Sequence, residues 1–275
     1  MSVVSVIRPV SAVLVTAALA SGCARKRDPA PAEMEEIASY MLGAWDDDRS
    51  LEDALGNLVP WLEENALADD AKDGYQLTPL EPAQVEVIDR PDRELDGLLG
   101  AAVVGVSPFT ITDHAATMLL VDQVYSNPRN YESYVRTVEG DPDVFLGGDG
   151  RIDTDNAITT SNFGVTIPYV LHKDYKWVHG RDLGEAIIAR SWISEKGCNE
   201  SGENCLQQSF SIDLWYVGNP VNPDGVDAET IRFTATWSEV TSSLDGLIGD
   251  DLQIAALANG MAYVFEATDE FISEQ

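Results

Sequence analysis

The sequence predicts an α+β protein, and three observations support this. Apolar residues recur at helical spacing near the start of the chain, within residues 33–67. Short segments with strand-like alternation, separated by glycine-, asparagine- and proline-rich turns, fill the middle of the chain. A long helical pattern closes it at residues 250–272. Because neighbouring strands joined by short turns pair antiparallel, we expect an antiparallel sheet with helices at both ends of the sequence.

The first 23 residues have the form of an export signal. One cation, Arg8, precedes an apolar run over residues 10–20, and small residues then lead into Cys23. The run is too short to span a membrane as a helix, which needs about 20 residues. This pattern resembles the lipobox of bacterial lipoproteins, in which the chain is cut before the cysteine and the cysteine is lipidated. The alternative is an ordinary signal peptide with an incidental cysteine, because Ala20 stands where the lipobox usually has leucine.

Cys23 would then begin a lipid-anchored tether over residues 23–32, which is basic and proline-containing and suits a spacer beside anionic lipid. Several acyl chains would hold the protein firmly at a membrane, whereas one chain binds only marginally. Ala24, in place of aspartate, resembles the outer-membrane sorting signal. We therefore expect a lipid-anchored protein of the bacterial cell envelope, at the outer membrane and facing the periplasm or the cell surface.

The chain is strongly acidic. It has 17 basic and 47 acidic residues, and cleavage after residue 22 removes Arg8 alone, which leaves 16 basic residues against 47 acidic ones and a net charge of −31. Binding to a phosphate backbone needs a basic surface, so we expect no nucleic-acid partner. Since the acids are spread along the chain, solubility or adaptation to salt explains them better than a cation site does.

Two further cysteines, Cys198 and Cys205, flank a polar, turn-rich loop. Export of the chain favours a disulfide between them. Zinc is the alternative, but this spacer is longer than the usual two to four residues and no second pair of ligands lies nearby. We expect a bridge that pins a hairpin and contributes about 2.5 kcal/mol in the chain-entropy model.

The elements divide the chain into an N-terminal helical region with a linker, residues 33–94, and a second domain, residues 95–275. In the first part we expect two helices within 33–67 and, in the proline-rich linker, a short strand at 85–88. In the second part we expect a strand over 98–112, a helix over 113–125 with Asp113 as its N-cap, strands at 156–165, 174–180, 184–193, 208–217 and 229–240, and the closing helix over 250–272.

This order of elements resembles the START-like superfamily, also called SRPBCC. Residues 125–138 are similar to the family's early helix and turn, and residues 167–177 to its strand in which a proline precedes a basic, an acidic and an aromatic residue, with Lys173 where arginine is usual. The resemblance covers residues 95–275 and leaves the N-terminal region unexplained. It implies a helix-grip fold, in which a curved antiparallel sheet wraps around a long C-terminal helix and leaves a hydrophobic cavity between them.

Small residues in the closing helix, over 252–263, either leave room for a ligand or let the sheet pack closer. On the strand at 208–217, alternation puts apolar residues on one face and Asp213 on the other. If the apolar face points inward, Asp213 and Arg190 form a surface pair; if it points outward, they form a buried pair that orients a polar head group, as START domains do. The candidate cavity residues are Trp177, Arg190, Asp213, Trp237, Ala256, Asn259, Gly260 and Tyr263.

Catalytic signatures are largely absent. The chain has three histidines and lacks the Gly-x-Ser-x-Gly, His-Glu-x-x-His and phosphate-loop motifs. His172, beside Asp174, is a candidate general base, although a histidine in a polar loop is the better explanation. Residues 149–153 resemble half of a calcium loop, but Phe145 and Gly147 stand where acids are needed. We expect no metal and no cofactor.

The sequence therefore predicts a membrane-anchored extracytoplasmic lipoprotein that binds a lipid or another hydrophobic small molecule in a START-like cavity, without catalysis. One alternative is a protein-interaction or envelope-assembly module without a ligand, which an exposed apolar patch over Trp45 and Trp61 would favour. The other is a cyclase- or hydrolase-like enzyme in the same cavity, with Arg190, Asp213 or His172 as its acid or base.

Overall fold

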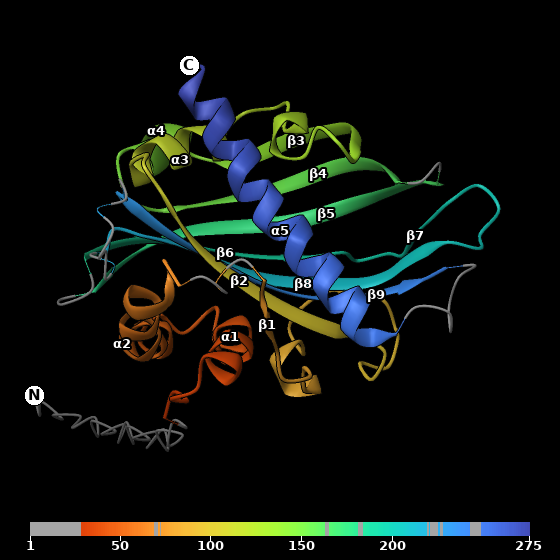
Figure 1. The fold of residues 1–275 in the computed structure, drawn as a ribbon, viewed down its shortest axis with the longest axis horizontal. Coiled ribbons are helices and arrows are strands. Elements are labelled where there is room, and N and C mark those ends of the chain that lie inside the picture. The colour runs from red at the N-terminus through yellow and green to blue at the C-terminus, as the bar shows by residue number, and fades with distance from the viewer. Residues whose placement is uncertain are drawn as a thin grey trace, which may run out of the picture.

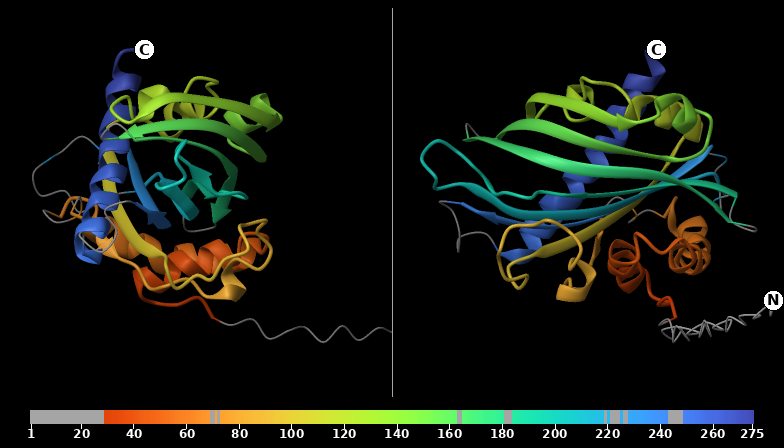
Figure 2. Two further views of the ribbon diagram at one scale, coloured as in Figure 1. Left: turned by 90° about the vertical axis from the view of Figure 1, so that its right-hand side faces the viewer. Right: turned by 180° about the vertical axis from the view of Figure 1, so that it is seen from behind.

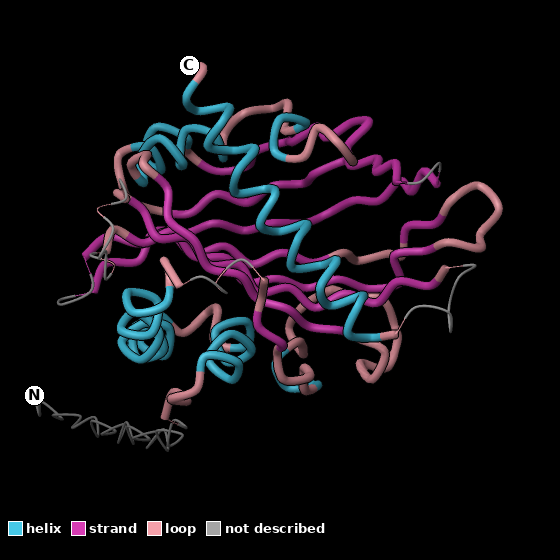
Figure 3. Tube along the Cα trace, in the orientation of Figure 1, coloured by secondary structure: helices cyan, strands magenta, loops and turns pink. Residues whose placement is uncertain are grey.

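The structure is a computed structural model that describes residues 29–68, 71, 73–162, 165–180, 184–218, 220, 225, 228–242 and 249–275. The expected signal peptide, Cys23 and most of the tether lie outside these residues. Figures 1 and 3 show a large antiparallel sheet with one long helix across it, which confirms the α+β, helix-grip arrangement.

The sheet has nine strands, and every pairing in it is antiparallel. Its order is β1-β2-β9-β8-β6-β5-β4-β3, with the short β7 paired to β8. The first long strand, β2, pairs with the last strand, β9, so segments far apart in the sequence meet within the sheet. The strands are β1 (Tyr75–Gln76), β2 (Leu99–Ser107), β3 (Tyr131–Gly140), β4 (Arg151–Asn162), β5 (Val165–Gly180), β6 (Gly184–Trp192), β7 (Gly197–Cys198), β8 (Cys205–Tyr216) and β9 (Thr230–Thr241).

The C-terminal helix α5 (Asp250–Ser273) crosses one face of the sheet, which we call the inner face (Figure 1). It packs against Ala101 and Val103 of β2. The neighbouring residues Ala102 and Val104 point to the opposite, outer face, as the two-residue period of a strand requires.

Helices α1 (Met34–Gly43) and α2 (Asp48–Asn65) cover part of the outer face, and Figure 2 shows them on the side of the sheet away from α5. Asp47 caps α2 by accepting a hydrogen bond from the backbone N–H of Ser50 at 3.3 Å. The two helices, the segment 75–98 and the outer residues of β2, β6, β8 and β9 share one apolar core. The division of the chain between residues 94 and 95 stays a prediction.

Several expected boundaries were wrong. Residues 85–88 form no strand, and they follow the 3-10 turn η1 (Pro82–Gln84). The only strand described within residues 33–94 is β1. Helix α3 (Ile111–Met118) begins earlier than expected, because Thr110 is its N-cap and Asp113 completes a capping box from the third helical position. It ends well before Tyr125, and a 3-10 turn, η2 (Val124–Ser126), follows.

The strand expected at 156–165 includes the end of β4 and the first residue of β5, because β-branched residues are frequent in both. The strand expected at 174–180 is the second half of β5. A short helix, α4 (Pro142–Leu146), connects β3 to β4 and is capped by Asp141. The closing helix occupies its expected residues.

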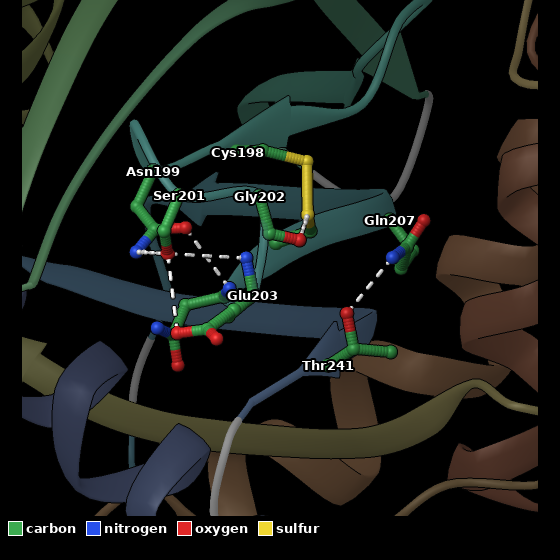
Figure 4. The surroundings of a disulfide bond; sticks show 9 residues. Cys198, Asn199, Ser201, Gly202, Glu203, Gln207 and Thr241 are labelled. Atoms are coloured by element: carbon green, nitrogen blue, oxygen red, sulfur yellow. Dashed lines mark hydrogen bonds between the residues drawn. A yellow bond between two sulfur atoms is a disulfide. The ribbon is translucent and has the colours of Figure 1, made fainter.

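The disulfide between Cys198 and Cys205 is confirmed, and it closes the loop between β7 and β8 (Figure 4). The two cysteines are also register partners in the hairpin. Asn199 accepts a hydrogen bond from the backbone N–H of Asn204 at 3.0 Å inside the loop. The bridge therefore reinforces a turn that already has its own polar contacts. None of the described helices is both long and apolar enough to cross a membrane.

Candidate functional site

A cavity of about 360 Å³ lies between the inner face of the sheet and α5. Its helix wall is mainly apolar and includes Leu257, Met261, Val264 and Phe265. Its sheet wall is mainly polar and aromatic, and comes from β3, β5, β6, β8 and β9 together with α3 and the segment 123–126. The two walls therefore differ in chemistry, so the cavity is amphipathic.

An ion pair between a buried aspartate and a largely buried lysine lies on the sheet wall. Lys173 Nζ of β5 lies 2.8 Å from Asp213 Oδ2 of β8. Asp213 also accepts hydrogen bonds from Thr234 Oγ1 at 2.7 Å and Ser211 Oγ at 3.3 Å. Burial would lower the pKa of Lys173, but the charge of Asp213 outweighs it with the help of nearby tyrosines and raises that pKa above its ordinary value. The lysine is therefore charged at neutral pH.

Arg136 of β3 adds a second buried cation to the cavity wall. Its Nε donates to Asn156 Oδ1 at 2.7 Å and its guanidinium also donates to the Met118 carbonyl and to Tyr134 Oη. These acceptors are all neutral, and among the described residues Arg136 forms no ion pair. Burial opposes its charge and neighbouring tyrosines favour it, with the pKa of Arg136 raised overall.

A chain of contacts ties α5 to the sheet at the edge of the cavity. Arg232 of β9 donates to Asp269 Oδ2 of α5 at 2.7 Å and to the Phe265 carbonyl at 3.0 Å. Ser107 Oγ donates to Asp269 Oδ1 at 2.8 Å and lies 3.0 Å from His114 Nε2. Because the serine proton is given to Asp269, His114 Nε2 must be the donor in the second contact.

His114 is therefore neutral and carries its proton on Nε2. Burial and the charge of Arg232 lower the pKa of His114 to about 3. Its other ring nitrogen, Nδ1, is buried and has no hydrogen-bond partner among the described residues, and the same is true of Arg232 Nε. Both residues line the cavity. An unpaired acceptor and an unpaired donor are thus available near its wall.

Tyrosines supply most of the aromatic surface on the sheet side. Burial raises the pKa of Tyr125 to about 12, and it also raises the pKa values of Tyr131, Tyr169 and Tyr175. These phenols stay neutral at ordinary pH and keep their protons for hydrogen bonding. Tyr125 also stacks on Phe271 of α5 with a distance of 4.0 Å between the ring centroids. This contact packs the C-terminal end of α5 against the segment 123–126.

Of the eight residues expected at the cavity, Asp213 is the one that lines it. Arg190 points to the outer face, where its Nε donates to Asp174 at 3.0 Å, so Arg190 and Asp213 form neither of the expected pairs. Trp237 is fully buried on the outer face and donates to the Thr78 carbonyl at 2.9 Å. Trp177 is on the inner side but packs against Phe145 of α4.

The residues expected from α5 lie beside the cavity lining. Ala256 and Asn259 are exposed, and Gly260 and Tyr263 are half-buried. Tyr263 is covered by Arg129, whose guanidinium carbon lies 3.9 Å from the ring centroid. The residues of α5 that line the cavity are Leu257, Met261, Val264, Phe265 and Thr268. Leu257, Met261 and Val264 each follow an expected residue by one position. A rotation of the helix by about one residue separates the expected face from the observed one.

Two other expectations concern the outer face. His172 lies within β5 and not in a loop, and it points away from the cavity. Trp45 is buried and Trp61 is half-buried against Tyr75, so these two side chains form no exposed apolar patch. No group of three or more metal-binding side chains occurs in the described part of the chain.

Sequence reasoning missed the cations Arg136, Lys173 and Arg232 of the cavity wall and its neutral histidine, His114. A signal for the strand residues was present. Polar residues alternate along β8 and β9, at Ser209, Ser211, Asp213, Thr234 and Thr236, and register aligns them across the sheet. Such a polar stripe marks the face away from the main core.

The comparisons with known proteins give weak likenesses. No family model matches the chain, and none of the curated proteins matches it. The crystal structure of Ara h 8.0201 gives a TM-score of 0.34 at 12% sequence identity, covering 65% of this chain and 99% of that one. TTHA0849 from Thermus thermophilus gives a TM-score of 0.36 at 13% identity, covering 64% of this chain and 97% of that one. The description of the fold therefore rests on its own topology.

Proposed function

We propose that this protein is a lipid-anchored, extracytoplasmic START-like carrier or sensor whose cavity binds an amphipathic small molecule with an anionic head group. The observation that carries the proposal is the contrast between the two walls of the cavity. The helix wall offers Leu257, Met261, Val264 and Phe265 to an apolar body, and the sheet wall offers charged and hydroxyl groups to a head. The volume of about 360 Å³ falls at the lower end of the range for small-molecule sites.

The charge balance of the cavity favours an anion. The positive charge of Lys173 is matched by Asp213, and that of Arg232 by Asp269. Arg136 remains, because its hydrogen bonds go to neutral acceptors. A buried cation without an anionic partner is costly, and a carboxylate or phosphate head group would offset that cost. This local excess of positive charge stands in a chain whose net charge is −30.

The anchoring and the location of the protein rest on its first 32 residues. A lipobox-like sequence ending at Cys23, a basic tether and the internal disulfide all suit an exported protein held at a membrane. A cavity protein held in this way would exchange its ligand with the lipid surface beside it. Mass spectrometry of the N-terminal peptide would test the anchor, since triacylation at Cys23 adds a large, hydrolysable mass that an ordinary signal cleavage does not.

Native mass spectrometry of residues 24–275, produced in an oxidising compartment and followed by organic extraction, tests the binding function. We expect a stoichiometric adduct of a few hundred daltons that extracts as an anionic amphiphile. A mass equal to the bare, oxidised chain, together with no displacement of a fluorescent fatty-acid probe, would contradict the proposal and favour the protein-interaction alternative.

A matched pair of variants tests the head-group site. Lys173→Met removes one of the cations that line the cavity and leaves the negative Asp213 without its ion-pair partner, so an anionic probe such as dansyl-undecanoic acid should bind at least about tenfold more weakly. Lys176→Met is the control, because Lys176 lies on the same strand but points to the outer face, where it contacts Asp48 and the Trp45 carbonyl. Equal losses in the two variants would show that the cavity charge does not select the ligand.

A further inference from the structure

Three side chains on the outer face of the sheet form a continuous line of hydrogen bonds. Asp155 of β4 and His172 of β5 are register partners, and Asp155 Oδ1 lies 2.7 Å from His172 Nδ1. His172 Nε2 lies 2.9 Å from the hydroxyl oxygen of Ser194, which follows β6. A carboxylate, an imidazole and a hydroxyl are thus joined in that order, each through the ring nitrogen that acid-base activation of a serine requires.

The contacts also set the proton positions. The ionised Asp155 can only accept, so Nδ1 of a neutral His172 donates to it. Nε2 then carries no proton and accepts the one from Ser194 Oγ. In this state the serine hydroxyl is held against a base that is free to take its proton.

Neighbouring residues hold the imidazole in place. His172 and Trp192 are register partners, and their rings stack with a centroid distance of 5.4 Å and an interplanar angle of 26°. The His172 side chain is 27% exposed, so it is fixed on one side by the indole and accessible on the other. Ser194 is half-buried.

A groove of about 640 Å³ opens beside the histidine and the serine, and both line it. Its floor crosses three strands at Val135, Ala157 and Val170, which are aligned by register. Val135 is 52% exposed and Val170 is 46% exposed, so the floor of the groove presents apolar surface to solvent. Figure 2, in its view from behind, shows none of the described helices crossing β4 and β5 on this side of the sheet.

The groove has room for a small apolar acyl group, and its floor matches such a group in chemistry. Valine and alanine side chains offer it a shallow, apolar floor next to Ser194 Oγ. Glu195 and Lys196 follow the serine and line the same groove, and Lys196 supplies its cation. Such a charge would stabilise a carbonyl oxygen that becomes negative when a nucleophile attacks.

We propose that Asp155, His172 and Ser194 form a second functional site, an esterase-type site that hydrolyses carboxylic esters with a small apolar acyl group. Ser194 Oγ attacks the carbonyl carbon while His172 Nε2 takes its proton. The tetrahedral intermediate collapses, the carbon–oxygen bond to the alcohol breaks, and the alcohol leaves with the proton from Nε2. Water then attacks the acyl-serine and gives a proton to Nε2, and the carboxylic acid leaves as that proton returns to Ser194 Oγ.

In this reaction Ser194 and His172 are catalytic, and Asp155 is a positioning residue. The site is independent of the cavity under α5, because its residues point to the opposite face of the sheet. A failure of the cavity proposal therefore leaves it intact, and the reverse also holds.

The test uses the full-length chain in detergent, a fluorophosphonate probe and p-nitrophenyl butyrate. We expect the probe to modify Ser194, as located by peptide mapping, and Ser194→Ala and His172→Gln to lower ester hydrolysis at least about 100-fold. Ser273→Ala is the control, because Ser273 is an exposed serine at the end of α5 and should react and hydrolyse like the unmodified chain.

The role of Asp155 has its own readout. Asp155→Asn should lower kcat about tenfold with KM unchanged, and Asp155→Glu should restore part of kcat, since a carboxylate again accepts from Nδ1. Probe labelling of the unmodified chain needs no variant, so it decides the matter even where a variant folds poorly. An unlabelled Ser194, or hydrolysis that survives Ser194→Ala, would overturn the proposal and leave the three residues as a structural hydrogen-bond chain.

Discussion

The two faces of strand β8 differ in role: one belongs to the packed core, and the other lines the cavity. On the outer face, Phe210, Ile212 and Leu214 are fully buried under α1 and α2. On the inner face, Ser211 and Asp213 face α5 and line a cavity. The sheet therefore keeps its apolar face for the packed core and turns its polar face toward the helix that it grips.

This arrangement gives the N-terminal region its role. A sheet whose apolar face stayed open to water would be unstable, and burial of that face is the largest favourable contribution to folding. Helices α1 and α2 bury the apolar outer face of the sheet. The C-terminal helix α5 therefore does not need to pack tightly against the whole inner face. The cavity is consequently free to hold charges without weakening the main core.

Trp237→Ala should cause the largest loss of stability, because it empties part of the outer core. The side chain is fully buried there, and its Nε1 donates to the Thr78 carbonyl. We expect the free energy of unfolding, measured by urea titration, to fall by about 3 to 5 kcal/mol. Thr236→Ala, one residue away on the inner face, should cost under about 1 kcal/mol. Similar losses for both would mean that the two faces contribute equally to the core.

Acid should destabilise the inner face through His114. Its pKa is about 3 in the folded state against an ordinary value of 6.5. Between these values the unfolded chain binds a proton that the folded chain does not, so stability falls as the pH decreases from 6.5 toward 3. At pH 4 this loss is about 3 kcal/mol relative to neutral pH.

The measurement compares the unfolding free energies of the unmodified chain, His114→Gln and His179→Gln at pH 7 and pH 4. His114→Gln should lose about 3 kcal/mol less than the unmodified chain over this interval, because it has no imidazole to protonate. His179 is exposed, and its variant should follow the unmodified chain. If all three lose the same amount, His114 is not the group responsible.

Removal of the disulfide should have the smallest effect and should spare both faces. The bridge closes a loop between β7 and β8, and neither cysteine lines the cavity. Replacing Cys198 and Cys205 together by serine should cost about 2.5 kcal/mol in thermal or urea unfolding. Binding of the fatty-acid probe should stay unchanged, and a loss of binding would show that the loop reaches the ligand.

Much of the fold follows from local pattern. The closing helix, the two N-terminal helices and the hairpin strands were predictable because their periodicity extends over many residues. The start of α3 was missed because Asp113 is as good an N-cap by type as Thr110, and only the hydrogen bonds distinguish the two positions. The boundary between β4 and β5 was missed because β-branched residues are frequent at the end of β4 and at the start of β5.

The residues of the candidate site were harder to predict, because local pattern does not show which face of the sheet meets α5. Alternation shows that Asp213 and Ile212 face opposite ways, but it does not say which face meets α5. The choice depends on where residues 33–94 pack, and those residues lie outside the region that the START-like resemblance covers. Lys173 and Arg136 reach the cavity only because β3, β5 and β8 bring them together across the sheet.

By itself, the sequence determined the composition of each face, the long closing helix, the disulfide and the export-type pattern of the N-terminus, because these depend on neighbouring residues along the chain. The tertiary structure alone decided which face became the core, which charges meet in the cavity and that Asp155, His172 and Ser194 are in line. Those outcomes depend on strand order, register and the side on which two distant helices pack, and no local pattern encodes a contact between residues so far apart in the chain.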